Sequence, residues 1–195
     1  MLRFVTTLEP DLPVLSDGVV LLRPFVATDA PALVDIWTDP TIRARNTVPE
    51  PSTDAALEWI AGHAAKAASG QIWEWALVDA RTDRLAGRRA LKGIDREQKR
   101  ASAACWIAPE FRGRQFAARS LRLAAAHAFA RGVIRVQAEC EVDNAASLRS
   151  VRAAGMRYEG TLRSFFVSNS GAKVDAEIFG LLAEDLDDAP AFRTS

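Results

Sequence analysis

Apolar and polar positions alternate most regularly between Val133 and Val142. From Ile134 onward every second side chain is apolar, and the positions between are arginine, glutamine or glutamate. A period of two is typical of a β-strand with one buried face. Similar runs bounded by turn residues predict six further strands, at about residues 19–24, 72–79, 85–94, 101–107, 158–167 and 173–182.

Four other segments carry apolar residues at helical spacing. The expected helices begin near residues 29, 53, 116 and 145 and end near residues 37, 67, 132 and 155. Asp29 and Ser52 are residue types that cap helix N-termini, and Gly132 and Gly155 are natural helix ends. Residues 38–51 contain three prolines and are expected to form a loop.

Strands and helices alternate along the chain, but adjacent strands are also joined by hairpins, so a purely parallel sheet is not expected. We predict an α/β (α+β) fold with a mixed, mostly antiparallel central sheet of about six to seven strands and helices on both faces. The length of 195 residues fits one domain with a substantial core. We assign residues 18–186 to this domain, residues 1–17 to an N-terminal extension and residues 187–195 to a flexible C-terminal tail.

Composition narrows the possible partners. The chain has 25 basic and 25 acidic residues, so bulk electrostatic binding of nucleic acid is not expected. No segment approaches the ~18 consecutive apolar residues that span a bilayer, and residues 1–13 do not resemble a signal peptide, so we expect a cytoplasmic protein without a membrane partner. Two cysteines and two histidines lack the spacing of metal ligands, so no metal is expected.

A short strand, a basic loop and a helix start follow one another at residues 106–117. The first turn of a helix has N–H groups without partners and the positive end of the helix dipole, so a phosphate binds there readily. Arg112 and Arg114 would add charge-assisted contacts, and Gly113 allows close approach to a ligand. The loop matches neither the Walker-type pattern nor the three-glycine dinucleotide pattern. A solvated basic loop without a ligand is the alternative.

Several segments in order resemble the GNAT acyltransferases, specifically the RimJ/RimL-like branch that modifies N-terminal or other amines. The segments that carry the resemblance are Leu22–Phe25 with Asp29, Trp106–Arg114, Asp143–Ser147, Ala154–Arg163, and Gly171, Asp175 and Leu181–Leu182. The resemblance covers roughly residues 18–186, and its combined order and spacing are much more specific than any single motif.

The resemblance implies an acyl-CoA-dependent N-acyltransferase. Acetyl-CoA is the expected co-substrate, and a primary amine of a protein N-terminus, an amino acid derivative or a small metabolite would attack it directly. The family's usual mechanism has no covalent enzyme intermediate, and the chain shows no Cys–His or Ser–His arrangement that would point to one. The protein would act as a monomer or a homodimer.

The resemblance also implies roles for individual residues. The CoA pyrophosphate would bind the amides and side chains of Arg112, Gly113, Arg114, Gln115, Phe116 and Ala117. A backbone N–H near Ile107 would stabilise the oxyanion. Asn144 and Ser147 would lie near the pantetheine arm, and Ser147 would protonate the leaving thiolate. For Asn144 the alternative is a helix cap, with Ser147 in the first turn.

The chain departs from the family pattern at three positions. Gln115 stands where the acyl-CoA loop usually has its central glycine, Val151 where many members have a tyrosine acid, and Ser102 where relatives often have a glutamate. These departures keep two other functions open. One is a non-catalytic or degenerate module that binds CoA or another ligand, and the other is an acyltransferase with a larger or carrier-bound acyl donor.

The acceptor side is less sharply predicted. Glu139, five residues before Asn144, matches the base position of related ribosomal alanine acetyltransferases, and the alternative is a solvated or salt-bridged strand face. Trp73 and Trp75 share one face of a strand. They line an acceptor pocket or, as large aromatics more often do, pack in the core.

Overall fold

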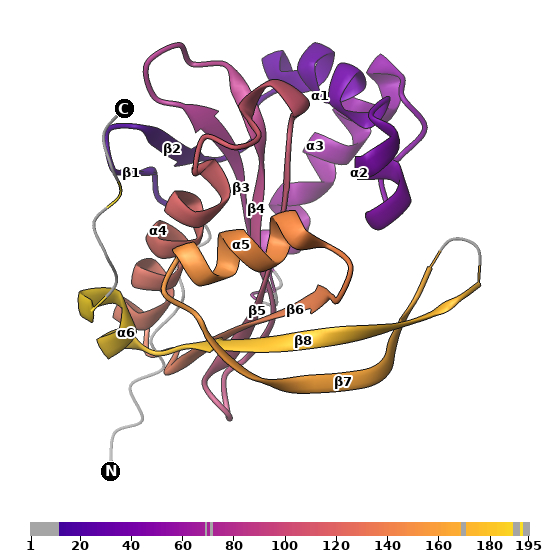
Figure 1. Cartoon of the computed structure of the whole chain (residues 1–195). Coiled ribbons are helices and arrows are strands. Elements are labelled where there is room, and N and C mark those ends of the chain that lie inside the picture. The colour runs from indigo at the N-terminus through magenta and orange to yellow at the C-terminus, as the bar shows by residue number, and fades with distance from the viewer. Residues whose placement is uncertain (1–11, 69, 71, 169–170, 189–191, 193–195) are drawn as a thin grey trace.

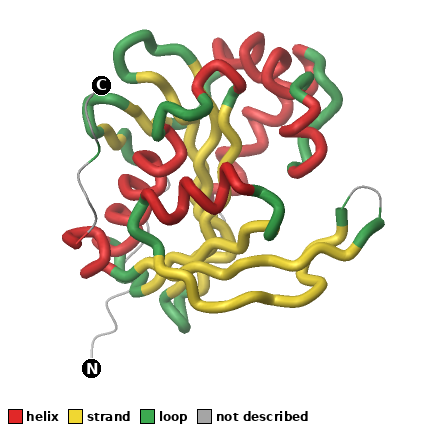
Figure 2. The backbone as a smooth tube through the Cα atoms, in the orientation of Figure 1, coloured by secondary structure: helices red, strands yellow, loops and turns green. Residues whose placement is uncertain are grey.

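The computed structural model describes residues 12–68, 70, 72–168, 171–188 and 192. Its centre is an eight-stranded sheet in the order β1-β2-β3-β4-β5-β6-β8-β7 (Figures 1 and 2). The strands are β1 (Leu15–Ser16), β2 (Val20–Arg23), β3 (Ile72–Asp79), β4 (Leu85–Asp95), β5 (Arg100–Ile107), β6 (Arg135–Glu141), β7 (Arg157–Val167) and β8 (Lys173–Leu181). All neighbouring strands are antiparallel except β5 and β6.

Six α-helices and two short 3-10 turns complete the described fold. They are η1 (Ala27–Asp29), α1 (Ala30–Trp37), α2 (Pro40–Arg45), α3 (Thr53–Ala68), η2 (Pro109–Phe111), α4 (Phe116–Ala130), α5 (Ala145–Ala153) and α6 (Ala183–Asp188). In the described part of the chain, no helix is long and apolar enough to cross a membrane.

The predicted mixed, mostly antiparallel sheet with helices on both faces is confirmed. The sheet has eight strands, where six to seven were predicted, because Leu15 and Ser16 pair with Leu22 and Leu21 and add an edge strand. This strand lies in the segment predicted as an N-terminal extension. At the other end, Phe192 lies against the guanidinium group of Arg119, while most of the predicted tail falls outside the described residues.

The loop predicted over residues 38–51 contains a helix. Asp39 caps α2 because its Oδ1 accepts a hydrogen bond from the Ile42 N–H at 2.9 Å, and Pro40 occupies the first helical position. Proline is favoured there because its missing N–H would have no intrahelical partner. The proline that suggested a loop therefore starts a helix.

The two faces of the sheet have different coverings. Trp73 and Trp75 point toward α4, with ring centroids 5.3 and 5.8 Å from His127. Burial, with a smaller effect from Arg131, lowers the pKa of His127 to about 4, so the ring is neutral at pH 7. Glu74, between the two tryptophans, points the other way, and its Oε2 lies 2.7 Å from Nε2 of His63 on α3.

A buried ion pair anchors the first helices to the sheet. Arg23 on β2 donates two hydrogen bonds of 2.8 Å to the carboxylate of Asp29, which also accepts the Val26 N–H at 2.9 Å. The Asp29 side chain is only 6% exposed. The hydrogen bonds to Asp29 raise the pKa of Arg23 above its already high value. The turn that leads into α1 is therefore fixed to β2.

Candidate functional site

The sheet opens between its two parallel strands. β5 and β6 pair only at their first residues, with Arg100–Ser102 opposite Arg135–Gln137. Beyond this point β5 continues along β4 to Ile107, and β6 continues along β8 to Glu141. The facing edges therefore carry backbone groups that no neighbouring strand satisfies. An extended ligand with its own amides can bind such edges.

A helix N-terminus lies at the end of this split. Gln115 is the N-cap of α4 and has φ +63°, the left-handed conformation that explains why relatives use glycine there. Its exposed side chain makes no capping hydrogen bond. Arg119 N–H to the Gln115 carbonyl, at 3.0 Å, is the first bond of the helix. The N–H groups of Phe116, Ala117 and Ala118 therefore have no intrahelical partners and face an anion favourably.

The loop arginines have partners within the chain. Arg112 donates to Asp39 Oδ1 at 2.7 Å and to the Ile107 carbonyl at 3.2 Å. Burial alone would raise the pKa of Asp39, but hydrogen bonds from Arg112 and the Ile42 N–H outweigh it and lower the pKa. Arg114 lies 3.5 Å from Asp79 and over the ring of Phe116. In this arrangement both guanidinium groups are held near carboxylates, whereas the first amides of α4 have no intrahelical partner.

On the β6 side of the split, Asn144 and Ser147 begin α5. Asn144 Oδ1 accepts the Ser147 N–H at 3.1 Å, so Asn144 has the helix-cap contact that was its alternative reading. Ser147 Oγ lies 3.1 Å from Cys140 Sγ. Burial raises the pKa of the Cys140 thiol, partly opposed by the hydrogen bond with Ser147. Val151, at the position of the missing tyrosine, is buried in the core.

Glu139 bridges the two strands where they separate. Its carboxylate accepts from Ser102 Oγ at 3.0 Å for each oxygen and from Gln137 Nε2 at 2.7 Å. The side chain is half-buried and forms no ion pair with another described residue. Glu139 therefore lies half-buried among uncharged hydrogen-bond donors, and its role as the base stays a prediction.

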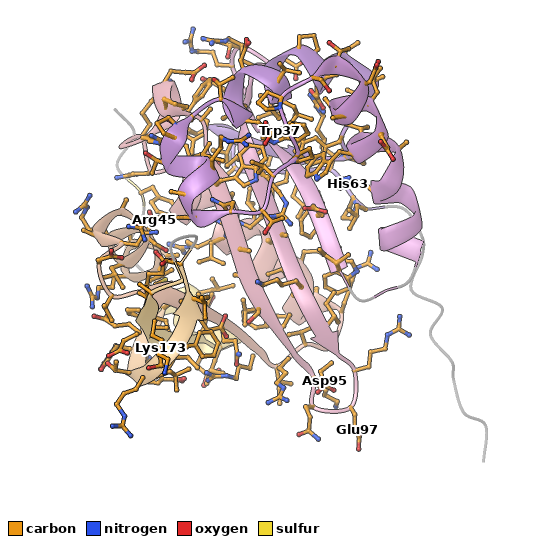
Figure 3. The ribbon with its side chains drawn as sticks, turned by 90° about the vertical axis from the view of Figure 1, so that its right-hand side faces the viewer. Trp37, Arg45, His63, Asp95, Glu97 and Lys173 are labelled. Atoms are coloured by element: carbon orange, nitrogen blue, oxygen red, sulfur yellow. The ribbon has the colours of Figure 1, made fainter. Side chains whose placement is uncertain are left out.

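Sequence reasoning missed Arg45. This residue ends α2 and contacts Glu141, the last residue of β6, and Asp143 Oδ1 at 3.0 Å. Figure 3 shows it between the N-terminal helices and the part of the molecule that holds the β7–β8 hairpin, whose Lys173 is labelled. The contact ties the N-terminal helices to the strand beyond the split. No local signal could have found it, because α2 itself was expected to be loop.

The two tryptophans lie away from these groups. Trp73 is 6% and Trp75 0% exposed, and both are on the α4 face. On β4, Ala90 pairs with Glu74, and Lys92, two residues further along, pairs with Ser102. Residues two apart on a strand share a face, so Ser102 lies on the Glu74 face. The Glu139 carboxylate, which Ser102 contacts, therefore lies on the face opposite the tryptophans. The burial of Trp73 and Trp75 against α4 is what core packing requires, so the candidate acceptor site does not include the tryptophans.

Replacing Gln115 by glycine is expected to raise stability by about 1 kcal/mol, because a side chain in the left-handed region is strained. Gln115→Ala is the matched control, since it removes the same polar group but keeps the strained Cβ. Urea unfolding of the three proteins measures the effect. A glycine variant no more stable than the alanine variant would show that the backbone at residue 115 is unstrained.

Comparisons with known proteins show which family the sequence matches. Residues 20–157 match the family model for the acetyltransferase (GNAT) domain. An uncharacterized N-acetyltransferase, p20 of Bacillus licheniformis, is 24% identical over 166 residues, which are 84% of this chain and 93% of that protein.

Solved structures show the same fold. Mycobacterium smegmatis RimJ in complex with CoA-disulfide is 22% identical with a TM-score of 0.77, covering 91% of this chain and 90% of RimJ. RimL, a ribosomal L7/L12 alpha-N-protein acetyltransferase solved with coenzyme A, is 21% identical with a TM-score of 0.75, covering 90% of this chain and all of RimL. Since the family model spans more than half of the sequence, the protein belongs to the GNAT acetyltransferase family.

Proposed function

We propose that the protein transfers the acetyl group of acetyl-CoA to a primary amine by direct attack. The observation that carries this proposal is the split between β5 and β6, with its unpaired strand edges leading to the free N–H groups of α4. The pantetheine arm of CoA has amides that can pair with these edges, and its pyrophosphate suits the helix N-terminus. Solved relatives named as complexes with CoA support CoA as the ligand.

The chemistry needs three groups around the thioester. The amine nitrogen attacks the carbonyl carbon, a C–N bond forms, and the C–S bond breaks. A backbone N–H at the open edge of β5 near Ile107 stabilises the oxyanion. The amine gives up one proton to become a nucleophile and a second as the amide forms, and the thiolate takes one up.

Glu139 is our candidate for the base. Its carboxylate stands at the point where β5 and β6 separate and is held by neutral donors, Ser102 and Gln137. Ser102 occupies the position where relatives often have a glutamate, and it is the residue that Glu139 touches. The carboxylate from β6 therefore reaches the place that a glutamate on β5 would occupy.

Ser147 is our candidate for the acid that protonates the thiolate. Its hydroxyl lies beside the split and its contact, Cys140 Sγ at 3.1 Å, is a weak hydrogen-bond partner. The hydroxyl is therefore readily turned toward a CoA sulfur that enters between the strands. Asn144 holds the first turn of α5, and with it Ser147, in place.

Thermal unfolding with acetyl-CoA, free CoA and succinyl-CoA tests the proposal. A ligand at 100 times its Kd stabilises by about 2.7 kcal/mol. For a domain of this size that raises Tm by about 5–11 °C. A rise with acetyl-CoA and acetylation of an amine in its presence are the expected results. A folded protein with no rise for any CoA would contradict the proposal, and a rise with succinyl-CoA alone would indicate a larger acyl group.

A further inference from the structure

A pocket of about 390 Å³ opens beside the candidate base. Its lining residues are Lys92, Gly93, Arg100, Ala101, Ser102 and Gln137. Lys92 pairs with Ser102 across β4 and β5, and Ser102 pairs with Gln137 across β5 and β6. Paired residues present their side chains on the same face, so this pocket lies on the face of the sheet that carries Glu139.

The pocket and the carboxylate share a wall. Ser102 and Gln137 line the pocket, and the same two side chains donate hydrogen bonds of 3.0 and 2.7 Å to Glu139. A molecule whose amine reaches Glu139 therefore has this pocket beside it for the rest of its atoms.

The charge of the pocket is positive. Lys92 is exposed and forms no ion pair with any residue in the described ranges. Arg100 has one acidic neighbour, Asp95, whose Oδ2 lies 3.6 Å from its Nε, and the Arg100 side chain remains 55% exposed. Figure 3 shows Asp95 at the turn between β4 and β5, at one end of the sheet. Gly93 adds no side chain to the opening. Two cations thus lie beside a candidate general base.

We infer that the acceptor carries an anionic group, a carboxylate or a phosphate, which Lys92 and Arg100 bind while its amine faces Glu139. This inference rests on the proposed function. Lys92 and Glu139 are two strand spacings and two residues apart, or roughly 12 Å between Cα atoms. With both side chains turned toward each other, the acceptor has its amine and anion separated by a few bonds, as in an amino acid or an aminoalkyl phosphate.

Pairs of acceptors test this directly. β-Alanine is compared with propylamine, and phosphoethanolamine with ethylamine, at saturating acetyl-CoA. A charge-assisted contact contributes about 10- to 100-fold in kcat/KM, so the anionic member of each pair is expected to react faster by that factor. Two short peptides that differ only in glutamate or glutamine at the second position show whether the anion belongs to a small molecule or to a peptide side chain.

The variant Lys92→Met should abolish most of this preference. Lys173→Met, an exposed lysine on β8, is the matched control and should keep it. Thermal unfolding in inorganic phosphate gives a readout independent of catalysis, because stabilisation by phosphate should be weaker in Lys92→Met than in Lys173→Met.

The outcomes separate the two proposals. Equal rates for charged and neutral amines, or a preference that survives in Lys92→Met, would overturn the anionic acceptor and leave the acetyltransferase standing. No CoA-dependent Tm rise and no turnover would contradict the proposed function. In that case the phosphate comparison still decides whether Lys92 binds an anion, and equal shifts in both variants would overturn it.

Discussion

Replacing Glu139 by glutamine is expected to lower kcat by about 100- to 1000-fold, because the variant keeps the shape of the side chain but cannot take a proton from the amine. Glutamine still accepts a hydrogen bond from Ser102, so the split between β5 and β6 should keep its geometry. The stabilisation by acetyl-CoA should therefore be unchanged, since backbone groups of the strand edges, and not the Glu139 carboxylate, are proposed to hold it. A loss confined to kcat is the signature of a group that acts on the reacting atoms.

Steady-state rates with acetyl-CoA and the best amine from the acceptor panel measure this effect. Glu58→Gln, at an exposed position of α3, is the control and should retain full activity. An acceptor whose nitrogen is unprotonated at the assay pH, such as an alkoxyamine, should lose less activity in Glu139→Gln, because the step that precedes attack is no longer needed. A kcat within threefold of the parent protein would remove Glu139 from the mechanism and point to a water chain leading to a more distant acid.

The elements could be predicted because their signals are local. Alternation identifies β6, and a basic loop that opens into an alanine-rich segment identifies the start of α4. Comparing the loop with the family pattern also marks Gln115 as unusual. The left-handed backbone at residue 115 is the physical reason that glycine is preferred there. The missed helix α2 shows the limit of such rules, since proline both interrupts helices and begins them.

The partners of the loop arginines could not be predicted in this way. Arg112 and Asp39 are 73 positions apart, and their contact depends on how α2 packs beside the end of β5. The sequence shows a basic loop and an acidic residue before a proline, but not that one reaches the other. The loop alone therefore predicts two arginines facing a phosphate, and their carboxylate partners follow only from the tertiary fold.

The face of each strand is a similar case. Alternation on β3 shows that Trp73 and Trp75 share one side and Glu74 takes the other, but not which side meets α4. Likewise, the contact of Glu139 with Ser102 requires the parallel register of β5 and β6, which holds for only three pairs. Register and helix placement are tertiary properties, so the acceptor side was the least predictable part of the site.

Among the single substitutions proposed for this protein, removing the charge of Asp29 should lower the free energy of unfolding the most. In Asp29→Asn the Arg23 guanidinium keeps its position on β2 but loses both charged hydrogen bonds, and breaking one partner of a buried ion pair typically costs about 3–5 kcal/mol. We expect the lower end of this range, because Arg23 also donates to the Pro24 carbonyl and lies 4.0 Å from Asp83. Thermal unfolding should show Tm lower by about 6–12 °C.

Two further variants identify the cause. Asp35→Asn, on the exposed side of α1, changes the same functional group without a buried partner and should leave Tm unchanged. The double variant Arg23→Met/Asp29→Leu replaces both charges with apolar groups and should recover much of the lost stability, as apolar replacements of buried ion pairs often do. If Asp29→Asn unfolds within about 2 °C of the parent protein, the pair has little net effect and other contacts hold α1. If the double variant is no more stable than Asp29→Asn, the hydrogen bond from the Val26 N–H, rather than the ion pair, is what the fold requires of Asp29.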